Sequence, residues 1–302
     1  MGGYQDRDRE IVDYQLYYLD NFKFSVRGPE PQKLEEKKYF VSIGAAQTFG
    51  CFTEKPYPVL LQGKINMQSL NLGFAGAGPY FFLNNQEFLM KYINNAKFAV
   101  IQVMSGRSES NSLFDSGGLE YLTRRSDGVK IGAHTAYDEV LRNHDKKYVK
   151  ELIAETRLNW VNNYKLLLEE IKIPKILFWF SIRKPYYREI FLCNKYAGIP
   201  AFFGKSNAGA LFGKFPQLVN PEMINQIRKY SDEYVECVSR RGMPQLLISR
   251  FTGKPITIDP GLARKDLGNG KRQKYNNYYP SPEMHIDAAN ALEKVCKKYS
   301  IN

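Results

Sequence analysis

The chain has 302 residues, of which 43% are hydrophobic and 14% aromatic, and it carries a formal net charge of +12. This composition excludes disorder for most of the chain and supplies enough apolar material for a large α/β core. The charge favours a small polyanionic ligand over nucleic acid, because no long block of lysine and arginine is present, although a generally basic solvated surface explains it equally well.

In chain order, residues 1–37 are polar with scattered aromatic residues, which predicts an extended arm and a short helix packed on the body. Short apolar runs bounded by glycine, proline or polar turns follow, and these are typical of buried parallel strands. They predict strands at 39–44, 69–72, 98–104, 175–182 and 245–250. Apolar residues near helical spacing predict helices at 57–62, 85–95, 145–171, 221–240 and 282–299.

This alternation predicts a doubly wound α/β fold, in which a mostly parallel five-stranded sheet has helices on both faces. We expect residues 38–302 to form a single α/β domain of catalytic type, with residues 1–37 as its arm. The loop-rich insertions 106–143 and 201–221 follow the third and fourth strands. They therefore belong at the carboxyl end of the sheet, where ligands bind in such folds.

The four cysteines are far apart and form no CxxC pair, so they predict neither a zinc knuckle nor a disulfide framework. The N-terminal residues lack the apolar stretch of a signal peptide, and no apolar run approaches the length of a membrane span. We therefore predict a cytoplasmic protein without stable membrane insertion and without a metal site.

The segment IGAAQTFG, at residues 43–50, directly follows the first predicted strand. Its two glycines and small side chains allow backbone N–H groups to face a ligand at a strand-to-helix turn. It is neither a Walker loop nor a GxGxxG motif. We place Gly44, Ala46, Gln47 and Thr48 in the candidate ligand site.

This segment and NLG at 71–73 resemble two sequence blocks of the SGNH-type hydrolases and related acyltransferases. The first block of that family reads G-D-S-x-T-x-G, and Gly44, Thr48 and Gly50 match it. Asn71 and Gly73 match the second block of that family. The resemblance covers roughly residues 39–80. It implies a flavodoxin/SGNH-like fold in which Gly73 supplies an N–H group to an oxyanion hole.

The nucleophilic serine of that family falls on Ala46, and its preceding aspartate falls on Ala45. A methyl group cannot attack an acyl carbon, so serine-esterase chemistry is absent if Ala46 is the natural residue. If Ala46 is an inactivating replacement, the esterase interpretation returns.

The segment SGRSESNS, at residues 105–112, follows the third predicted strand, where the family has G-x-N-D with its asparagine donating to the oxyanion. Here the segment offers Arg107, Ser110 and Asn111, and we assign Asn111 to the substrate or oxyanion site. A guanidinium among hydroxyl groups and an amide suits phosphate or sulfate better than an acyl oxyanion. An ordinary loop salt bridge of Arg107 accounts for the pattern equally well.

His285 lies at the start of the last predicted helix, where the family has its catalytic histidine in D-x-x-H. Pro282 stands at the aspartate position, and Glu283 is displaced by one residue. We therefore predict that His285 is a general base without the usual orienting carboxylate. A histidine that packs at a helix start is the structural alternative.

The segment at 264–274 more loosely resembles the phosphate-binding loop near the end of nucleotide-dependent sulfotransferases. In that family an R-K-G loop holds the 3′-phosphate of the sulfate donor PAPS. Arg264, Lys265 and Lys271 stand in a comparable arrangement, with Asp266 in place of the glycine. The resemblance implies that these cations, with Arg107 and Ser110, hold the phosphates of PAPS.

The main prediction is a sulfotransferase that moves a sulfuryl group from PAPS to a hydroxyl group of a sugar, a polysaccharide or a small acceptor. Such transfer needs positioning and charge neutralisation more than a covalent nucleophile, so it tolerates Ala46. The alternatives are an SGNH-type esterase or acyltransferase and its inactive carbohydrate-binding relative.

The predicted partners are an anionic nucleotide donor and a hydroxyl-bearing acceptor, without nucleic acid, and a homodimer is left open on general grounds. Across the chain, the segments GAAQTFG, NLGFAGAGP, QVMSGRS and YYPSPEMH resemble an uncharacterised bacterial family often found beside polysaccharide-modifying enzymes. That resemblance supports the fold and the setting and assigns no reaction.

Overall fold

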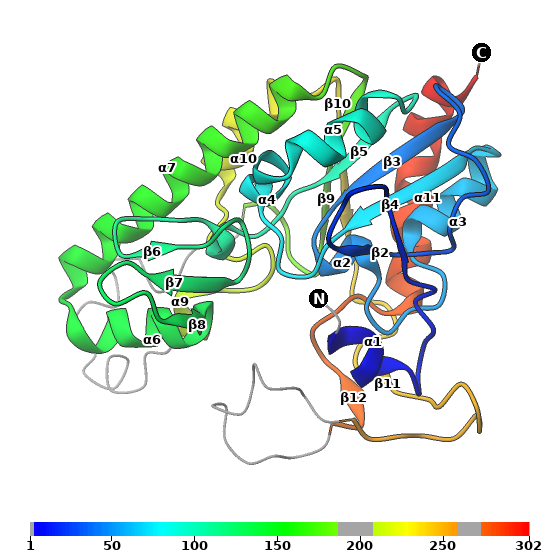
Figure 1. Ribbon diagram of the computed structural model, residues 1–302. Coiled ribbons are helices and arrows are strands. Elements are labelled where there is room, and N and C mark those ends of the chain that lie inside the picture. Colours follow the sequence, from blue (N-terminus) through cyan, green and yellow to red (C-terminus); the bar gives the residue numbers. More distant parts are fainter. Residues whose placement is uncertain (1–2, 187–207, 259–272, 302) are drawn as a thin grey trace.

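A five-stranded parallel sheet forms the centre of the computed structural model, which describes residues 3–186, 208–258 and 273–301 (Figure 1). The strands are β3 (Tyr39–Gly44), β4 (Gln68–Gly73), β5 (Ala99–Gln102), β9 (Lys175–Ser181) and β10 (Glu233–Val238). Their order in space is β10-β9-β5-β3-β4, and every neighbouring pair is parallel. The predicted doubly wound α/β fold with a five-stranded parallel sheet is therefore confirmed.

The strand order reverses direction beside β3. The chain runs from β3 to one neighbour, β4, and then returns to the other neighbour, β5, before it continues to β9 and β10. The register aligns the carboxyl ends of the strands, because Gly44 pairs with Gly73 and Ile43 with Ile101. Loops that leave β3 and β5 in opposite directions open a crevice at this edge, which is where ligands bind in open α/β sheets.

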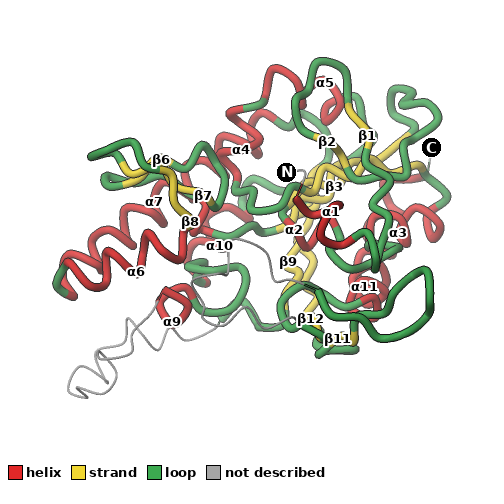
Figure 2. The backbone as a smooth tube through the Cα atoms, turned by 60° about the horizontal axis from the view of Figure 1, so that its bottom comes forward, coloured by secondary structure: helices red, strands yellow, loops and turns green. Residues whose placement is uncertain are grey.

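Helices cover both faces of the sheet (Figures 1 and 2). One face packs against α4 (Pro79–Asn84), α5 (Gln86–Asn94), α7 (Lys146–Glu170) and α10 (Pro221–Arg228). The other face packs against α3 (Tyr57–Ile65) and α11 (Pro282–Ser300). Because strand side chains alternate, Val41 and Ile43 face the first layer whereas Phe40 faces the second. The sheet is thus buried on both sides, as its nearly continuous apolar strands require.

The fifth strand differs from the predicted one. The sequence predicted a helix through 221–240 and a strand at 245–250, but α10 ends at Arg228 and β10 occupies Glu233–Val238. The burial pattern changes here from the period of a helix to the alternation of a strand, since Val235 and Cys237 are buried while Glu236 between them is exposed. Of the predicted strand, only β11 (Gln245–Leu246) forms, and it pairs with β12 (Tyr275–Asn276) outside the central sheet.

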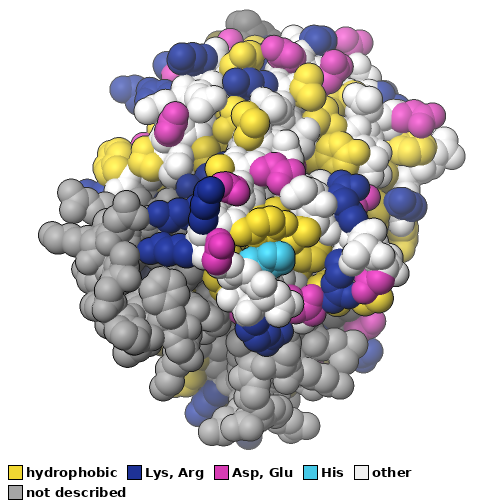
Figure 3. All heavy atoms as spheres, turned by 90° about the vertical axis from the view of Figure 1, so that its left-hand side faces the viewer, with side chains coloured by type: hydrophobic (Ala, Val, Ile, Leu, Met, Phe, Trp, Pro, Cys, Tyr) yellow, Lys and Arg dark blue, Asp and Glu magenta, His cyan; other side chains and the backbone are white. Residues whose placement is uncertain are grey.

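The first long insertion contains ordered structure rather than loop alone. After the 3₁₀ turn η1 (Gly106–Ser108) come β6 (Phe114–Asp115), β7 (Tyr121–Arg124), β8 (Lys130–Gly132) and α6 (Ala133–Asn143). These elements, with α9 (Ala208–Phe212) and the first turns of α7, bury a hydrophobic cluster of their own. We call this unit the cap. The cap lies to one side of the central sheet in Figure 2. Figure 3 shows the molecule from the left-hand side of Figure 1, and basic and acidic side chains are interspersed on that face.

The N-terminal segment contains α1 (Gly3–Asp8), β1 (Tyr17–Tyr18) and β2 (Ser25–Val26). It is tied to the body by buried polar contacts: the Tyr14 hydroxyl accepts from the Phe52 backbone N–H at 3.0 Å, and Arg27 donates to the carbonyl of Thr53 at 3.0 Å. None of the helices in the described ranges has the length and hydropathy of a transmembrane span.

Candidate functional site

A small cavity lies where the strand order reverses, at the carboxyl ends of β3, β4 and β5. It contains about 290 Å³ of space not filled by atoms, part of it open to solvent. Its wall combines small residues, hydroxyl groups, one ion pair and aromatic rings. The lining residues are Ala45, Ala46, Gln47, Gly76, Ala77, Ser105, Arg107, Ser108, Glu120, Phe215, Tyr278 and Tyr279.

The floor of the cavity is the start of α2 (Ala46–Phe49), a single helical turn directly after β3. Gln102 at the end of β5 fixes this turn, because its Oε1 accepts from the Ala45 N–H at 3.0 Å and from the Thr48 hydroxyl at 2.7 Å. No side chain caps the turn, and the first N–H groups of a helix have no partner within it. Ala46 and Gln47 therefore bring backbone donors to the cavity, whereas Thr48 lies buried beneath it.

The glycine-rich turn after β4 forms a second wall, but not through the predicted glycine. Gly73 donates its N–H to Asn71 Oδ1 at 2.9 Å, and a Cβ there would lie 2.2 Å from the backbone nitrogen of Phe49. Gly73 thus allows close packing of β4 on α2, and its N–H is already used. Gly44 has a similar packing role, since a Cβ would lie 2.2 Å from the Thr48 hydroxyl. The glycine in the cavity wall is Gly76.

Arg107 reaches the cavity from η1, after β5, and forms an ion pair with Glu120 of the cap. Its guanidinium also lies 3.1 Å from His134 Nε2 and donates to the Tyr278 hydroxyl at 3.4 Å. The two charged side chains are only 11% and 27% exposed. Gly76, whose φ is +76°, makes room for this pair, because a Cβ there would lie 2.7 Å from Glu120 Cγ. The carboxylate therefore neutralises Arg107 inside the cavity.

The other polar residues of the 105–112 segment divide between the cavity and the cap. The Ser108 hydroxyl donates to the Gly76 carbonyl at 2.8 Å, and the Ser105 hydroxyl accepts from the Arg107 N–H at 3.2 Å. Asn111 is buried in the cap, where it donates to the Tyr137 hydroxyl and accepts from two backbone N–H groups. Ser110 bonds to Asp115 at 3.0 Å. Neither Ser110 nor Asn111 lines the cavity, so the predicted clamp and oxyanion roles do not fit their positions.

Two tyrosines that sequence reasoning missed form the remaining wall. Asn276 holds them in an Asx turn, because its Oδ1 accepts from the N–H groups of Tyr278 at 3.1 Å and Tyr279 at 2.9 Å. Asn276 in turn donates to Gln245 at 2.8 Å. The Tyr278 hydroxyl accepts from Gln217 Nε2 at 2.8 Å and thus links this wall to Arg107. The double tyrosine before the last predicted helix was the only sequence signal for this wall.

His285 lies inside the second hydrophobic layer rather than in the cavity wall. It is fully buried, its ring stacks on Tyr57, and its Nδ1 accepts from the Tyr57 backbone N–H at 3.1 Å. Burial, with a smaller contribution from the positive charge of Arg27, lowers the pKa of His285 to about 3. Nε2 is buried without a hydrogen-bond partner among the described residues, and because Nδ1 accepts a hydrogen bond, Nε2 carries the ring proton. An enclosed neutral ring of this kind does not suit the predicted general base, so the structural alternative describes it better.

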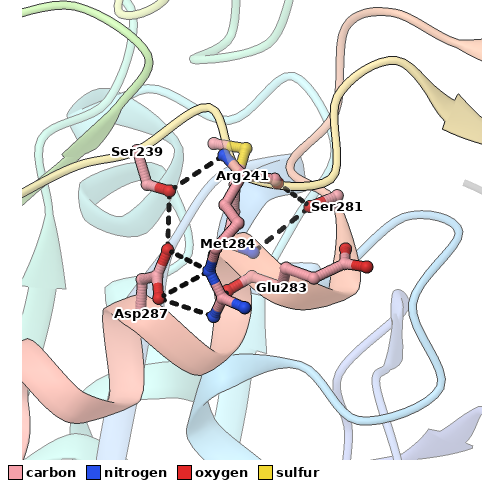
Figure 4. Close-up of polar contacts among 6 residues, drawn as sticks. All are labelled: Ser239, Arg241, Ser281, Glu283, Met284 and Asp287. Atoms are coloured by element: carbon pink, nitrogen blue, oxygen red, sulfur yellow. Dashed lines mark hydrogen bonds and ion pairs between the residues drawn. The ribbon is translucent and has the colours of Figure 1, made fainter.

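Asp287, two residues after His285, belongs to a polar cluster around Arg241 (Figure 4). Asp287 accepts from the Ser239 hydroxyl at 2.7 Å and from Arg241 Nη2 at 2.7 Å. Ser281 caps α11 by accepting from the Met284 N–H at 3.2 Å, and its hydroxyl donates to the Arg241 carbonyl. This cluster fastens the loop after β10 to the first turns of α11. It therefore holds His285 in place through the helix backbone.

Because His285 is buried, the free energy of unfolding of the protein depends on pH in the acidic range. Because the folded-state pKa of His285 lies below the ordinary value of 6.5, the unfolded chain binds the extra proton first, and stability falls as the pH falls from 6.5 towards 3. We expect this loss to reach about 3 kcal/mol at pH 4. Urea unfolding at pH 7 and pH 4 checks it: His285→Gln should lose less stability between these two pH values than the parent. Equal losses would contradict the assignment.

A buried carboxyl lies directly after η1, behind the cavity wall. Glu109 is fully buried between α4 and α7 and accepts from Asn163 Nδ2 at 2.6 Å. Burial raises the pKa of Glu109 to about 8, and the hydrogen bond from Asn163 opposes the shift only in part. Its carboxyl is therefore largely protonated at neutral pH, and it does not add to the charge near the cavity.

The remaining predicted cofactor residues, Arg264, Lys265 and Lys271, lie outside the described residues. Within the described ranges, no group of three or more histidine, cysteine, aspartate or glutamate side chains is placed to hold a metal ion. Of the residues predicted to bind PAPS, Ala46, Gln47 and Arg107 line the cavity.

Comparison with known proteins gives a family match for the first third of the chain. Residues 2–116 match a family model described as a domain of unknown function (DUF6473). These residues contain the first three strands of the central sheet, β3, β4 and β5, and the floor of the cavity. No curated protein matches the sequence.

Solved structures that resemble the chain include SGNH-type and carbohydrate-active proteins. One, from Slackia heliotrinireducens and described as a candidate SGNH hydrolase, shares 13% identity, with a TM-score of 0.37 and coverage of 85% of this chain and 98% of that one. A family two carbohydrate esterase from Clostridium thermocellum, in complex with cellohexaose, shares 12% identity, with a TM-score of 0.38 and coverage of 91% and 67%. A lipolytic protein of the G-D-S-L family from Desulfitobacterium hafniense shares 12% identity, with a TM-score of 0.35 and coverage of 85% and 99%.

Proposed function

We propose that the chain is a carbohydrate-binding relative of the SGNH-type esterases, which holds a small, neutral, hydroxyl-rich ligand in the cavity and forms no acyl-enzyme. The observation that carries the proposal is the Arg107–Glu120 ion pair inside a cavity lined by tyrosines. A paired guanidinium and carboxylate offers both donors and acceptors to ligand hydroxyl groups without a net charge. Aromatic rings beside them supply apolar faces for the C–H surfaces of a sugar.

The floor of the cavity supports the second half of the proposal. Ala46 occupies the position of the family's nucleophile and lines the cavity with a methyl group. The hydroxyl groups of Ser105 and Ser108 in the same wall are engaged with the Arg107 N–H and the Gly76 carbonyl. Covalent acyl transfer needs a nucleophile activated by a base, and His285 is enclosed in the core. Binding without covalent chemistry is therefore the activity that fits these residues.

The ion pair also bears on the main sequence prediction of sulfuryl transfer. A donor such as PAPS carries several negative charges and needs cations to hold them. Among the described residues of the cavity wall, Arg107 is the single lysine or arginine, and Glu120 already neutralises it. The described cavity thus favours a neutral ligand over a polyanionic donor.

Isothermal titration with neutral sugars tests the proposal. Cellobiose, methyl glycosides and an O-acetylated glucose are titrated into the protein, with PAP as the anionic comparison. We expect a neutral sugar to bind, and we expect Glu120→Ala to weaken that binding roughly tenfold or more, because the lost carboxylate leaves Arg107 with an unbalanced charge. The matched control is Glu139→Ala, which breaks the ion pair with Arg124 in the cap; the Glu139 side chain is 29% exposed, close to the 27% of Glu120.

Two outcomes would contradict the proposal. Binding of PAP with no binding of any sugar would return the site to the nucleotide-dependent transferases. Turnover of p-nitrophenyl acetate by the parent protein, abolished by Ser105→Ala, would show that the chain forms an acyl-enzyme after all. Ala46→Ser is expected to give no esterase activity, since His285 is fully buried, is not among the residues that line the cavity and has its Nδ1 bonded to the Tyr57 N–H.

A further inference from the structure

An exposed hairpin tip lies outside the wall of the cavity. The chain from Leu247 folds back on itself at residues 249–254, and Ile248 bridges to Pro255. The turn is closed by hydrogen bonds from the Ser249 N–H to the Lys254 carbonyl and from the Gly253 N–H to the Ser249 carbonyl, both at 2.9 Å. We call residues 249–254 the tip. It extends from the lower part of the molecule in Figure 1, away from the central sheet.

The tip holds an aromatic side chain out into solvent. Phe251 is 61% exposed, although its backbone is fixed: its N–H donates to the Ser249 hydroxyl at 3.3 Å. The base of the tip is anchored to the N-terminal arm, since Arg250 donates its backbone N–H to the Glu10 carbonyl and its Nε to the Arg9 carbonyl, each at 2.8 Å. The turn thus presents a large apolar side chain to solvent on a hydrogen-bonded backbone, with Arg250 as its recorded partner within the described residues.

Further apolar and basic side chains lie in the tip and on the strands next to it. On the neighbouring strand, Tyr275 is 43% exposed, and Ile248 at the base of the tip is also exposed. The cations are Arg250, whose guanidinium lies 4.4 Å from the Phe251 ring centroid, with Lys254 and Lys274. Asp13 lies 3.6 Å from Arg250, whereas the two lysines make no ion pair within the described residues. The tip and the strands next to it thus carry three exposed apolar side chains and three exposed basic ones, and we call these six residues the patch.

We propose that this tip is a peripheral docking site for an anionic lipid surface. Phe251 would enter the headgroup region of the bilayer, while the cations of the patch contact the lipid phosphates. The exposed tip and the apolar side chains of the patch favour a lipid surface over a nucleic acid, because a nucleic-acid site presents cations along a groove. Docking of this kind is reversible and needs no membrane-spanning segment, and it is independent of the ligand in the cavity.

Vesicle co-sedimentation of the full chain tests the proposal. The probes are vesicles of phosphatidylcholine alone and of phosphatidylcholine with about a third phosphatidylglycerol, at low and at high salt. We expect binding to the anionic vesicles at low salt and release at high salt. Phe251→Ala should lower the partition coefficient for the anionic vesicles roughly tenfold. The double variant Lys254→Glu and Lys274→Glu should abolish binding. The matched control is Leu158→Ala on α7, where the leucine is 59% exposed outside the patch.

The other outcomes overturn the proposal. Absence of anionic-vesicle binding by the folded parent, or equal binding by the parent and Phe251→Ala, would exclude the tip as a lipid contact. A concentration-dependent dimer in light scattering that Phe251→Ala dissociates would identify a second copy of the chain as the occupant. Retardation of single-stranded DNA that is lost in Phe251→Ala, without vesicle binding, would identify a nucleic acid. Circular dichroism of each variant confirms that it is folded.

Discussion

Gly73→Ala is expected to destabilise the protein by about 4 kcal/mol or more. The added Cβ would lie 2.2 Å from the backbone nitrogen and 2.7 Å from the Cα of Phe49, and 2.7 Å from the carbonyl carbon of Thr48. These are backbone atoms of α2, so no side-chain rotation can relieve the contact. The strand β4 and the turn α2 would have to separate, and both belong to the floor of the cavity. Urea unfolding of the purified variant measures the loss.

The matched control is the same replacement at Gly63, which lies on the exposed side of α3. A Cβ at Gly63 meets no atom within 4 Å, so alanine should stabilise the helix by about 0.5 to 1 kcal/mol. If Gly73→Ala were as stable as Gly63→Ala, the close contact between β4 and α2 would not exist in solution.

Glu109→Gln is expected to stabilise the protein in mildly alkaline solution. The folded-state pKa of Glu109 is about 8 and its ordinary value is 4.5, so the folded chain keeps a proton that the unfolded chain loses. This contribution to stability is therefore complete below pH 4.5 and is lost as the pH rises to 8. Glutamine keeps the acceptor for Asn163 but has no proton to lose. Between pH 5 and pH 8 the stability of the variant should gain about 4 kcal/mol relative to the parent.

Denaturant unfolding at pH 5, 6.5 and 8 follows this difference. Glu151→Gln, on the exposed face of α7, controls for the loss of a carboxyl group from the chain. A constant difference between the parent and Glu109→Gln across this range would contradict the raised pKa. His285 titrates in the same way in the parent and in Glu109→Gln, so its contribution cancels in the difference between them.

The central sheet was largely readable from the sequence because its strands are buried on both faces. The first strand was predicted with the bounds that β3 has, and three more were placed within one to two residues of β4, β5 and β9. The edge strand β10 was missed, because only one of its faces is buried and its alternating pattern continues from the amphipathic helix α10. A strand buried on one face has fewer apolar residues to mark it in the sequence. The predicted helix was therefore extended past the end of α10 and through β10.

The site was readable only where local sequence determines it. Ala46, Gln47 and Arg107 were predicted because each directly follows a strand, and strand ends meet at one edge of a parallel sheet. Glu120 and Tyr278 were missed, since they reach the cavity from the cap and from the segment after β12 through long-range contacts. His285 was placed in the site by motif position alone, whereas its surroundings in the core, which depend on α3 and α11, decide its chemistry.

The separate core of the cap has a consequence for how this molecule can diverge. The cap buries its own cluster of apolar residues and contributes a single lining side chain, Glu120, to the cavity. Insertions or replacements within the cap can therefore be accommodated without disturbing the sheet. We expect ligand preference among sequences of this type to change first in the cap, while the segments after β3 and β4 stay fixed by the packing of backbone on backbone.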